Sequence, residues 1–338
     1  MVTEKKKVCI TGSAGQTGRH ILKALSKYSD QLDVCACIHE KERTVQENTV
    51  KSICPHACPC SVDADDLDAL VESFKGVSDL FIVPSASEAK VRQTFNYIRA
   101  AKKANVPFVA VLSMSGAERR NYLWADQFWS IEEEVKRSGL PNWCILRSAF
   151  YMQNLLLYAE QYAEGRVPLP IGPDAKFAPI DVHDVGEAAA VILKDCKPHK
   201  NKTYTVTGPE AVTAKDITSV LSQFMQQELQ MNKKLEWADI SLNDAKQILL
   251  SAGVPPGEVQ GLAEFYRTVR DTGPDFESVT DDFKNLTGHE ATSMKDWLHR
   301  VQDHLVALMK QSSGGKQSQV QQSESQTTQP AASSSQVA

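Results

Sequence analysis

The sequence predicts an α/β protein: a doubly wound, Rossmann-like parallel sheet with a smaller, partly interleaved C-terminal α+β cap domain. Three observations favour this class. Short apolar runs alternate with segments of helical periodicity over the first 150 residues. The runs are continuously apolar, as is typical of parallel strands buried on both faces. A glycine-rich loop follows the first run, at the junction between the first predicted strand and the first predicted helix.

The elements follow from these patterns in chain order. Six apolar runs are expected to be strands: residues 8–11, 32–38, 58–62, 79–83, 108–112 and 143–146. Helical spacing between them predicts helices over 19–28, 91–104 and 131–137, with another helix beginning near 63–67. Right-handed crossovers between these strands leave few possible topologies.

The pattern becomes less regular after Arg147, which suggests a domain boundary. We divide the chain into a Rossmann-like sheet domain (1–150), a cap domain (151–310) and a Gln/Ser-rich tail (311–338). In the cap domain we expect helices over 155–163, 214–226, 242–251 and 293–309, and a strand over 203–207. Sixteen of the 28 tail residues are Gln or Ser and none is aromatic, so the tail is expected to be disordered.

Composition and charge exclude several classes of function. The 338 residues carry a net charge of −5, so bulk basicity gives no reason to expect a nucleic-acid partner. The longest purely apolar run, 188–193, is far shorter than the ~20 residues of a membrane span. The N-terminus has no apolar core of a signal peptide. We expect a cytoplasmic protein without membrane contact; its oligomeric state is not indicated.

Eight cysteines are expected to be reduced thiols rather than a disulfide framework. The run from Cys54 to Cys60 matches no familiar zinc spacing, so a metal site is the least favoured interpretation and none is predicted. Because strand residues alternate, Cys35 and Cys37 could face Cys58 and Cys60 across neighbouring strands. Such thiols could be a redox-responsive pair or simply small buried hydrophobic residues.

The glycine loop is the strongest motif. It spans residues 11–18, Thr-Gly-Ser-Ala-Gly-Gln-Thr-Gly. Gly12 would permit a tight turn, Gly15 would let the backbone approach a pyrophosphate, and Gly18 would allow close packing of helix on strand. The following helix would direct its unpaired N–H groups at the phosphates. The loop therefore predicts dinucleotide binding; a glycine turn without a ligand is the alternative.

The end of the second predicted strand decides between NAD and NADP. The sequence there, His39-Glu-Lys-Glu-Arg43, is mixed. Lys41 and Arg43 could neutralise a 2′-phosphate, whereas Glu40 would repel it. NADP(H) is therefore favoured over NAD(H). Asp63, after the third strand, is placed either to contact adenine or to cap a helix.

Eight further motifs occur in order along the chain, at 113–117, 131–133, 138–141, 145–147, 150–154, 181–185, 207–210 and 286–288. With the glycine loop, they resemble the NmrA-like family of atypical short-chain dehydrogenases, from about residue 7 to about 305. The resemblance implies NAD(P)H-dependent reduction of quinones, dyes or plant phenolics. Other members of the family are regulators that bind the dinucleotide without turning over a substrate.

The resemblance also implies roles for single residues. Residues 12–17 would line the pyrophosphate, 39–43 the adenosine ribose, 84–86 the nicotinamide ribose and 151–154 the nicotinamide and substrate cleft. Arg147, in the 145–147 motif, could simply end a strand with a structural ion pair. The expected cofactor-binding residues are Gly12, Ser13, Ala14, Gly15, Gln16, Thr17, Gly18, His39, Lys41, Arg43, Val62, Asp63, Pro84, Ser85, Arg92, Tyr151 and Asn154.

The sequence departs from the wider superfamily at the residues that would supply a proton to the substrate. Its reductases use a Tyr-x-x-x-Lys pair, in which the lysine lowers the pKa of the tyrosine. Here the lysine position falls on Phe128, and Asp126, four residues after Tyr122, would raise the pKa of that phenol. The usual pair is therefore not expected to act. A quinone could take its proton from water, from Tyr151 or from His183.

Two functions remain in competition. We favour an NAD(P)H-dependent reductase of a quinone-like or other planar carbonyl substrate. Aromatic residues would suit such a substrate, or would simply pack a helix on the sheet; they are Trp124, Phe128, Trp129, Phe150 and Tyr151. The alternative is a dinucleotide-sensing regulator that contacts a protein partner through its cap domain and tail. The missing lysine, the cysteines and the tail favour that alternative.

Overall fold

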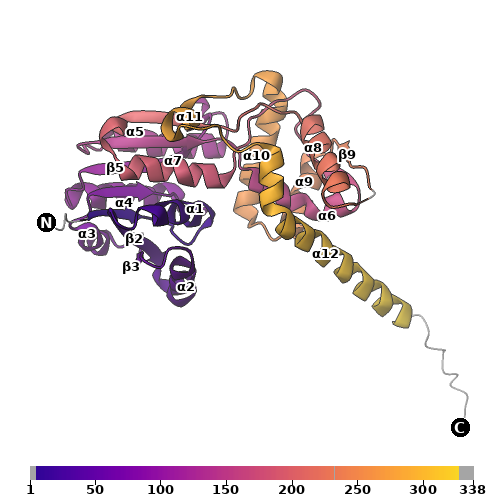
Figure 1. Ribbon diagram of the computed structural model, residues 1–338, viewed down its shortest axis with the longest axis horizontal. Helices are drawn as coiled ribbons and strands as arrows, with labels where there is room; N and C mark the ends of the chain where they lie inside the picture. The colour runs from indigo at the N-terminus through magenta and orange to yellow at the C-terminus, as the bar shows by residue number, and fades with distance from the viewer. Residues whose placement is uncertain (1–4, 232, 327–338) are drawn as a thin grey trace, which may run out of the picture.

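A seven-stranded, fully parallel sheet forms the body of one half of the molecule, on the left in Figure 1. The computed structural model describes residues 5–231 and 233–326. The strand order is β3-β2-β1-β4-β5-β6-β8. The strands are β1 (Lys6–Ile10), β2 (Leu32–His39), β3 (Cys58–Val62), β4 (Asp79–Ile82), β5 (Phe108–Met114), β6 (Trp143–Ser148) and β8 (Lys202–Val206). The order reverses between β1 and β4, so the predicted doubly wound fold is confirmed.

Helices cover both faces of this sheet. On one face lie α1 (Gln16–Leu25), α2 (Arg43–Ile53), α7 (Val182–Lys194) and α11 (Asp282–Thr287). On the other lie α3 (Leu67–Phe74), α4 (Lys90–Lys103) and α5 (Leu123–Arg137). Side chains alternate between the two faces along β1, so Val8 and Ile10 pack on the first face and Cys9 packs on the second. Each fully buried Leu or Ile contributes about 1.5–3 kcal/mol to this packing.

A second unit follows the sheet and has its own core. It contains α6 (Ala159–Ala163), α8 (Ala214–Gln227), α9 (Leu242–Ser251), α10 (Pro256–Thr272) and the first part of α12 (Met294–Gln326). Two short parallel strands, β7 (Arg166–Pro168) and β9 (Glu236–Ala238), complete it. Its core includes the fully buried Tyr158, Tyr266 and Trp297. We call this unit the cap.

Sheet and cap are interleaved in sequence. The strand predicted over 203–207 is present as β8, but it pairs with β6 in the main sheet rather than lying in the cap, where the sequence analysis placed it. α7 likewise lies against α1 on the sheet. The predicted helix over 155–163 is a 3₁₀ segment, Met152–Tyr158, followed by the short α6. The chain therefore leaves the sheet after β6, returns for α7 and β8, and then enters the cap again.

α12 differs most from the prediction. It packs on the cap through Trp297, Leu298 and Leu305, then projects away from the molecule (Figure 1). The helix continues through 311–326, where a disordered tail was expected. A helix satisfies its own backbone hydrogen bonds and Gln is a good helix former, so a polar segment can extend an existing helix. Residues 327–338 of the predicted tail lie outside the described residues. No helix in the described part of the chain has the length and apolarity of a membrane span.

Candidate functional site

The glycine loop joins β1 to α1 in the conformation that the sequence predicts. Gly12 has a φ of +60°, the left-handed region that favours glycine. A Cβ at Gly18 would lie 2.2 Å from the carbonyl oxygen of Gly12, so only glycine fits there. The buried Ser13 hydroxyl donates to the carbonyl of Ile10 over 2.7 Å. The turn and the close helix packing are therefore as expected, and Ser13 and Gly18 serve to shape the loop.

A cavity of 540 Å³ opens beside this loop, at the carboxyl ends of β1, β2 and β4. Ligands of open α/β sheets bind at such a reversal of strand order. Cap residues Leu262 and Val254 line its other side. Most of the predicted cofactor residues also line it: Gly12, Ala14, Gly15, Gln16, Thr17, His39, Val62, Pro84, Ser85, Tyr151 and Asn154.

The residues at the N-terminus of α1 fit a pyrophosphate. Gly15 is the N-cap of the helix and no side chain caps it. The first-turn residues Gln16 and Thr17 line the cavity, and no acidic side chain lies in that turn. Free N–H groups and the positive end of the helix dipole therefore meet at one place in the cavity, which is an anion-binding arrangement.

The charged residues predicted for the adenosine end lie around the cavity, not in its wall. Lys41 and Arg43 are exposed, and Arg43 makes an exposed ion pair within α2. Asp63 accepts a hydrogen bond from the Asp65 N–H over 2.9 Å, so it caps a local turn. Arg92 pairs with the carboxylate of Asp65. Four of the predicted contacts are thus surface groups, three of which already have partners within the chain.

Tyr151 links the loop to the end of β6. Its hydroxyl oxygen lies 3.1 Å from that of Thr17 and 3.4 Å from that of Ser148. Burial raises the pKa of this phenol, and the two hydrogen bonds only partly offset the effect. Tyr151 is therefore placed to hold the loop beside a bound phosphate, and it is a poorer acid than an exposed tyrosine.

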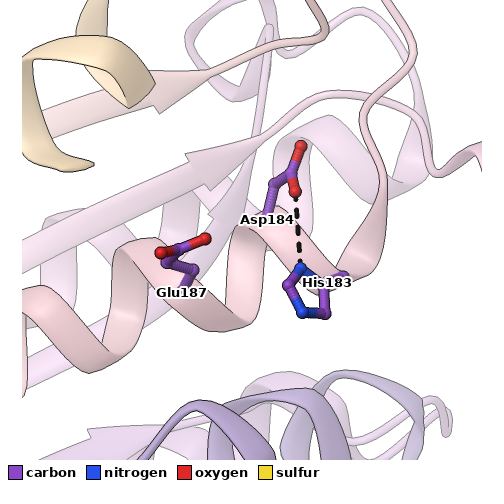
Figure 2. A group of neighbouring side chains, drawn as sticks. All are labelled: His183, Asp184 and Glu187. Carbon is purple, nitrogen blue, oxygen red and sulfur yellow. Dashed lines mark ion pairs between the residues drawn. The ribbon is translucent and has the colours of Figure 1, made fainter. Parts of the chain in front are cut away.

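His183, the second candidate proton donor, does not line the cavity. It lies in the first turn of α7 near Asp184 and Glu187, where Figure 2 shows the three side chains along one stretch of helix. The His183 Nδ1 lies 3.6 Å from Asp184. Both Asp184 oxygens accept hydrogen bonds from Thr292, at 2.6 and 2.7 Å. The Asp184 carboxylate therefore holds the segment before α12, whereas His183 lies outside the cavity in which the sequence analysis expected it to donate a proton.

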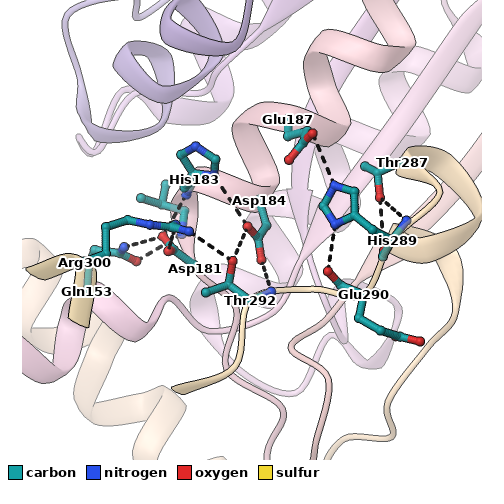
Figure 3. Close-up of polar contacts among 11 residues, drawn as sticks. Gln153, Asp181, His183, Asp184, Glu187, Thr287, His289, Glu290, Thr292 and Arg300 are labelled. Atoms are coloured by element: carbon teal, nitrogen blue, oxygen red, sulfur yellow. Dashed lines mark hydrogen bonds and ion pairs between the residues drawn. The ribbon is translucent and has the colours of Figure 1, made fainter. Parts of the chain in front are cut away.

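The same network anchors the cap to the sheet, as Figure 3 shows. Asp181 is the buried N-cap of α7 and accepts from the His183 N–H over 2.9 Å. Its carboxylate also accepts from Gln153 over 2.6 Å and pairs with Arg300 of α12. A carboxylate at a helix N-terminus is stabilised by the dipole as well as by these donors. The motif at 181–185 therefore has a structural role: it connects the cap to the sheet.

The region of the missing lysine faces the cavity. Phe128 and Trp124, both on α5, line it. Tyr122 does not; its hydroxyl points at the sulfur of Met114, 3.9 Å away. Burial is the largest cause that raises the pKa of Tyr122. The predicted cause was wrong, because Asp126 pairs with Arg120 over 2.8 Å instead, but the direction of the shift is as expected.

A buried lysine that the sequence analysis did not single out lines the same region. Lys90, the first residue of α4, is 5% exposed and lines the cavity. Its Nζ lies 4.9 Å from the ring centroid of Phe128 and 5.2 Å from that of Trp124. Glu258 of α10 lines the cavity too and is the charged group that acts on Lys90. The only signal in the sequence is a lysine soon after the loop that follows β4.

The five aromatic residues predicted for the substrate divide into two groups. Trp124, Phe128 and Tyr151 line the cavity. Phe150 instead stacks on Phe265 in the cap core, with ring centroids 5.0 Å apart. Trp129 lies under the Lys136 ammonium, outside the cavity. Packing therefore explains the last two, as the alternative interpretation allowed.

The cysteines fit their structural alternative only in part, because Cys35 and Cys37 are buried whereas Cys58 is exposed and Cys60 half-buried. Cys35 and Cys37 lie opposite Cys58 and Cys60 in the β2–β3 register, and all are free thiols. Cys9 of β1 joins them, with its sulfur 3.3 Å from that of Cys37. A redox role for the cysteines stays a prediction.

Arg147 is placed as its structural alternative predicts. It makes two hydrogen bonds, of 2.8 and 2.7 Å, with the fully buried carboxylate of Glu132, so it forms a structural ion pair.

Comparison with known proteins agrees with the fold. Quinone oxidoreductase 2 of Escherichia coli is 28% identical over 298 residues, which cover 86% of this chain and 96% of that protein. The NAD(P)H azoreductase of Xenophilus azovorans is 24% identical over 86% of this chain and 96% of its own. A solved Escherichia coli NADPH-dependent quinone oxidoreductase, complexed with NADPH, superposes with a TM-score of 0.74 at 24% identity. It covers 87% of this chain and 99% of its own.

The family pattern extends over nearly the whole folded chain. Residues 4–298 match the NmrA-like family, a span that includes the glycine loop, the sheet and most of the cap. The ordered motifs that suggested the family from the sequence lie within this span. The chain belongs to the NmrA-like family.

Proposed function

We propose that this protein is an NADPH-dependent reductase of quinone-like or other planar carbonyl compounds. The observation that carries the proposal is one continuous cavity. It connects the uncapped N-terminus of α1, where a pyrophosphate fits, to the aromatic side chains of Trp124 and Phe128. Its volume, 540 Å³, is in the usual range for small-molecule sites. Relatives named as a quinone oxidoreductase and an NAD(P)H azoreductase support the assignment.

The cofactor would lie along the sheet edge from β2 to β4. Gly15 and Thr17 would hold its phosphates, and Pro84 and Ser85 would border the nicotinamide ribose. His39 and Gln46 line the adenosine end, and the His39 N–H donates to the Gln46 side chain over 2.8 Å, which fixes α2 against β2. The reduced nicotinamide supplies a hydride; the protein positions it and excludes water.

A preference for NADPH would come from the two basic residues just after His39. Lys41 and Arg43 are exposed at the start of α2, so their side chains can turn toward a 2′-phosphate without breaking a buried contact. Glu40 accepts a hydrogen bond from Ser61, which orients this carboxylate toward β3. The complex of the solved relative with NADPH supports this preference. A cytoplasmic location and a small-molecule partner are part of the proposal.

The test is direct turnover. Purified protein is mixed with NADPH and a panel of quinones, aldehydes and azo dyes, and loss of NADPH absorbance is followed. We expect oxidation that depends on a quinone and is absent from a glycine-loop variant, Gly15→Glu. Tight NADPH binding with no turnover of any compound would favour the dinucleotide-sensing regulator instead.

A further inference from the structure

Reduction of a quinone needs a proton as well as a hydride, and the superfamily's usual lysine is absent. Its position is occupied by Phe128, whose ring faces the cavity. We propose that Lys90, which lines the same cavity with its Nζ 4.9 Å from the centroid of this ring, donates the proton. The inference rests on the proposed reductase function and names its acid. Lys90 comes from α4, so the chain would place an ammonium in the cleft from a different element.

The geometry holds the Lys90 ammonium in the cleft. Lys90 is 5% exposed, and its Nζ lies about equally far from two ring centroids, 4.9 Å from Phe128 and 5.2 Å from Trp124. Both rings line the cavity and would flank a flat substrate. Cation–π contact fixes the direction of the ammonium without neutralising it. Among the described residues, no carboxylate forms an ion pair with Lys90. Its protons therefore remain available to a ligand.

The surroundings also make this ammonium a stronger acid than an exposed lysine. Burial lowers the pKa of Lys90, and its place in the first turn of α4, at the positive end of the dipole, acts in the same direction. Glu258 opposes the shift, and its own pKa is raised by burial. Tyr151 is the weaker candidate because burial raises its pKa. The other titratable groups that line the cavity are Cys37, His39 and Tyr97.

The proposed step balances in atoms and charge. The hydride from the reduced nicotinamide nucleotide adds two electrons and one hydrogen to the quinone, which leaves a hydroquinone with one anionic oxygen. The N–H bond of Lys90 breaks as an O–H bond forms on that oxygen, which gives the neutral hydroquinone and a neutral amine. Water then restores the ammonium, with the Glu258 carboxylate favouring the charged form. Before transfer, the ammonium also stabilises the developing oxyanion.

Three variants separate these roles. Lys90→Met removes the proton and the charge, Lys90→Arg keeps a charge that does not deprotonate, and Lys103→Met is an exposed control at the other end of α4. We expect kcat with a quinone to fall roughly 100-fold or more in both Lys90 variants, with NADPH affinity unchanged. Wild-type kcat should fall as the pH rises through the lowered pKa of Lys90. In Glu258→Gln this fall should begin at lower pH, because the amine loses its stabilising carboxylate.

A second measurement needs no turnover. Bound 4-nitrophenol, whose anion is yellow, is titrated in the NADP⁺ complex of each variant. The Lys90 ammonium should lower the apparent pKa of the bound phenol in the wild type and in Lys90→Arg, but not in Lys90→Met. The proposal would be overturned if Lys90→Met kept kcat within about threefold of the wild type. It would also be overturned if the pKa of the bound nitrophenol were the same in Lys90→Met as in the wild type. A wild type that oxidises no NADPH with any quinone would refute the reductase function itself, while the nitrophenol titration still decides whether Lys90 faces the ligand.

Discussion

A negative charge introduced at Gly15 should remove most of the affinity for NADPH. Gly15 is the N-cap of α1 and lines the cavity where a pyrophosphate fits. A carboxylate on a glutamate side chain there would lie roughly 6 Å from the phosphates. At an effective dielectric constant of about 20, repulsion between two unit charges at that separation is about 3 kcal/mol, a loss of affinity of roughly 100-fold.

The matched control is Gly15→Gln, which has the same size without the charge. A Cβ at this position would lie 3.2 Å from the carbonyl oxygen of Gly12, so both variants carry the same small steric cost. Fluorescence titration with NADPH should therefore give a much larger dissociation constant for the Glu variant than for the Gln variant. The ratio should shrink as salt is added. Equal affinities for the two variants at low salt would refute the placement of phosphates at α1.

Three further predictions concern the surface, the core and the pH dependence of stability. Replacing Lys41 and Arg43 by Ala should weaken NADPH binding roughly tenfold or more and leave NADH nearly unchanged; equal effects would place the 2′-phosphate elsewhere. Arg147→Met removes two charge-assisted hydrogen bonds from the buried Glu132 carboxylate, which keeps Ser113 and Lys136 as partners, so urea denaturation should show a loss of about 2–3 kcal/mol; a loss below 1 kcal/mol would contradict the ion pair. Burial lowers the pKa of His20 from 6.5 to about 4. Between these pH values His20 is therefore protonated in the unfolded chain and mostly neutral in the folded chain. Stability should fall by about 2 kcal/mol as the pH drops from 6.5 toward 4, and His20→Asn, compared by the same denaturation, should flatten that decline.

The sheet was predictable because its signal is local. Continuous apolar runs and helical spacing located six strands and most flanking helices, since burial on both faces leaves a clear pattern. Four of the described helices were not predicted: α2, α7, α10 and α11. The first two were missed for opposite reasons. α2 buries only Val50, so it has almost no apolar face, whereas the second half of α7, from 188 to 193, is apolar all round and shows no helical period.

Without the family resemblance, which placed side chains such as His39, Tyr151 and Asn154 at the cavity, the candidate site was predictable only where backbone conformation decides. Glycines at 12 and 18 are required by a positive φ and by a close contact, and both constraints are visible in the sequence. The placement of side chains from distant segments is not visible there. Lys90 lies over the ring of Phe128, 38 residues later, and its charge is influenced by Glu258, 168 residues later, so an isolated lysine gives no sign that it is buried. His183 does not line the cavity because α7, which carries it, packs against α1 on one face of the sheet, and the sequence gives no sign of this placement.

Amide hydrogen exchange with and without NADPH locates the nucleotide most directly. If the cavity holds the cofactor, saturating NADPH should slow exchange in residues 11–18 and 83–86 and in the first turn of α2, and should leave the projecting half of α12 unchanged. Protection confined to the cap, or tight NADPH binding that leaves the loop between β1 and α1 exchanging at its original rate, would contradict the assignment.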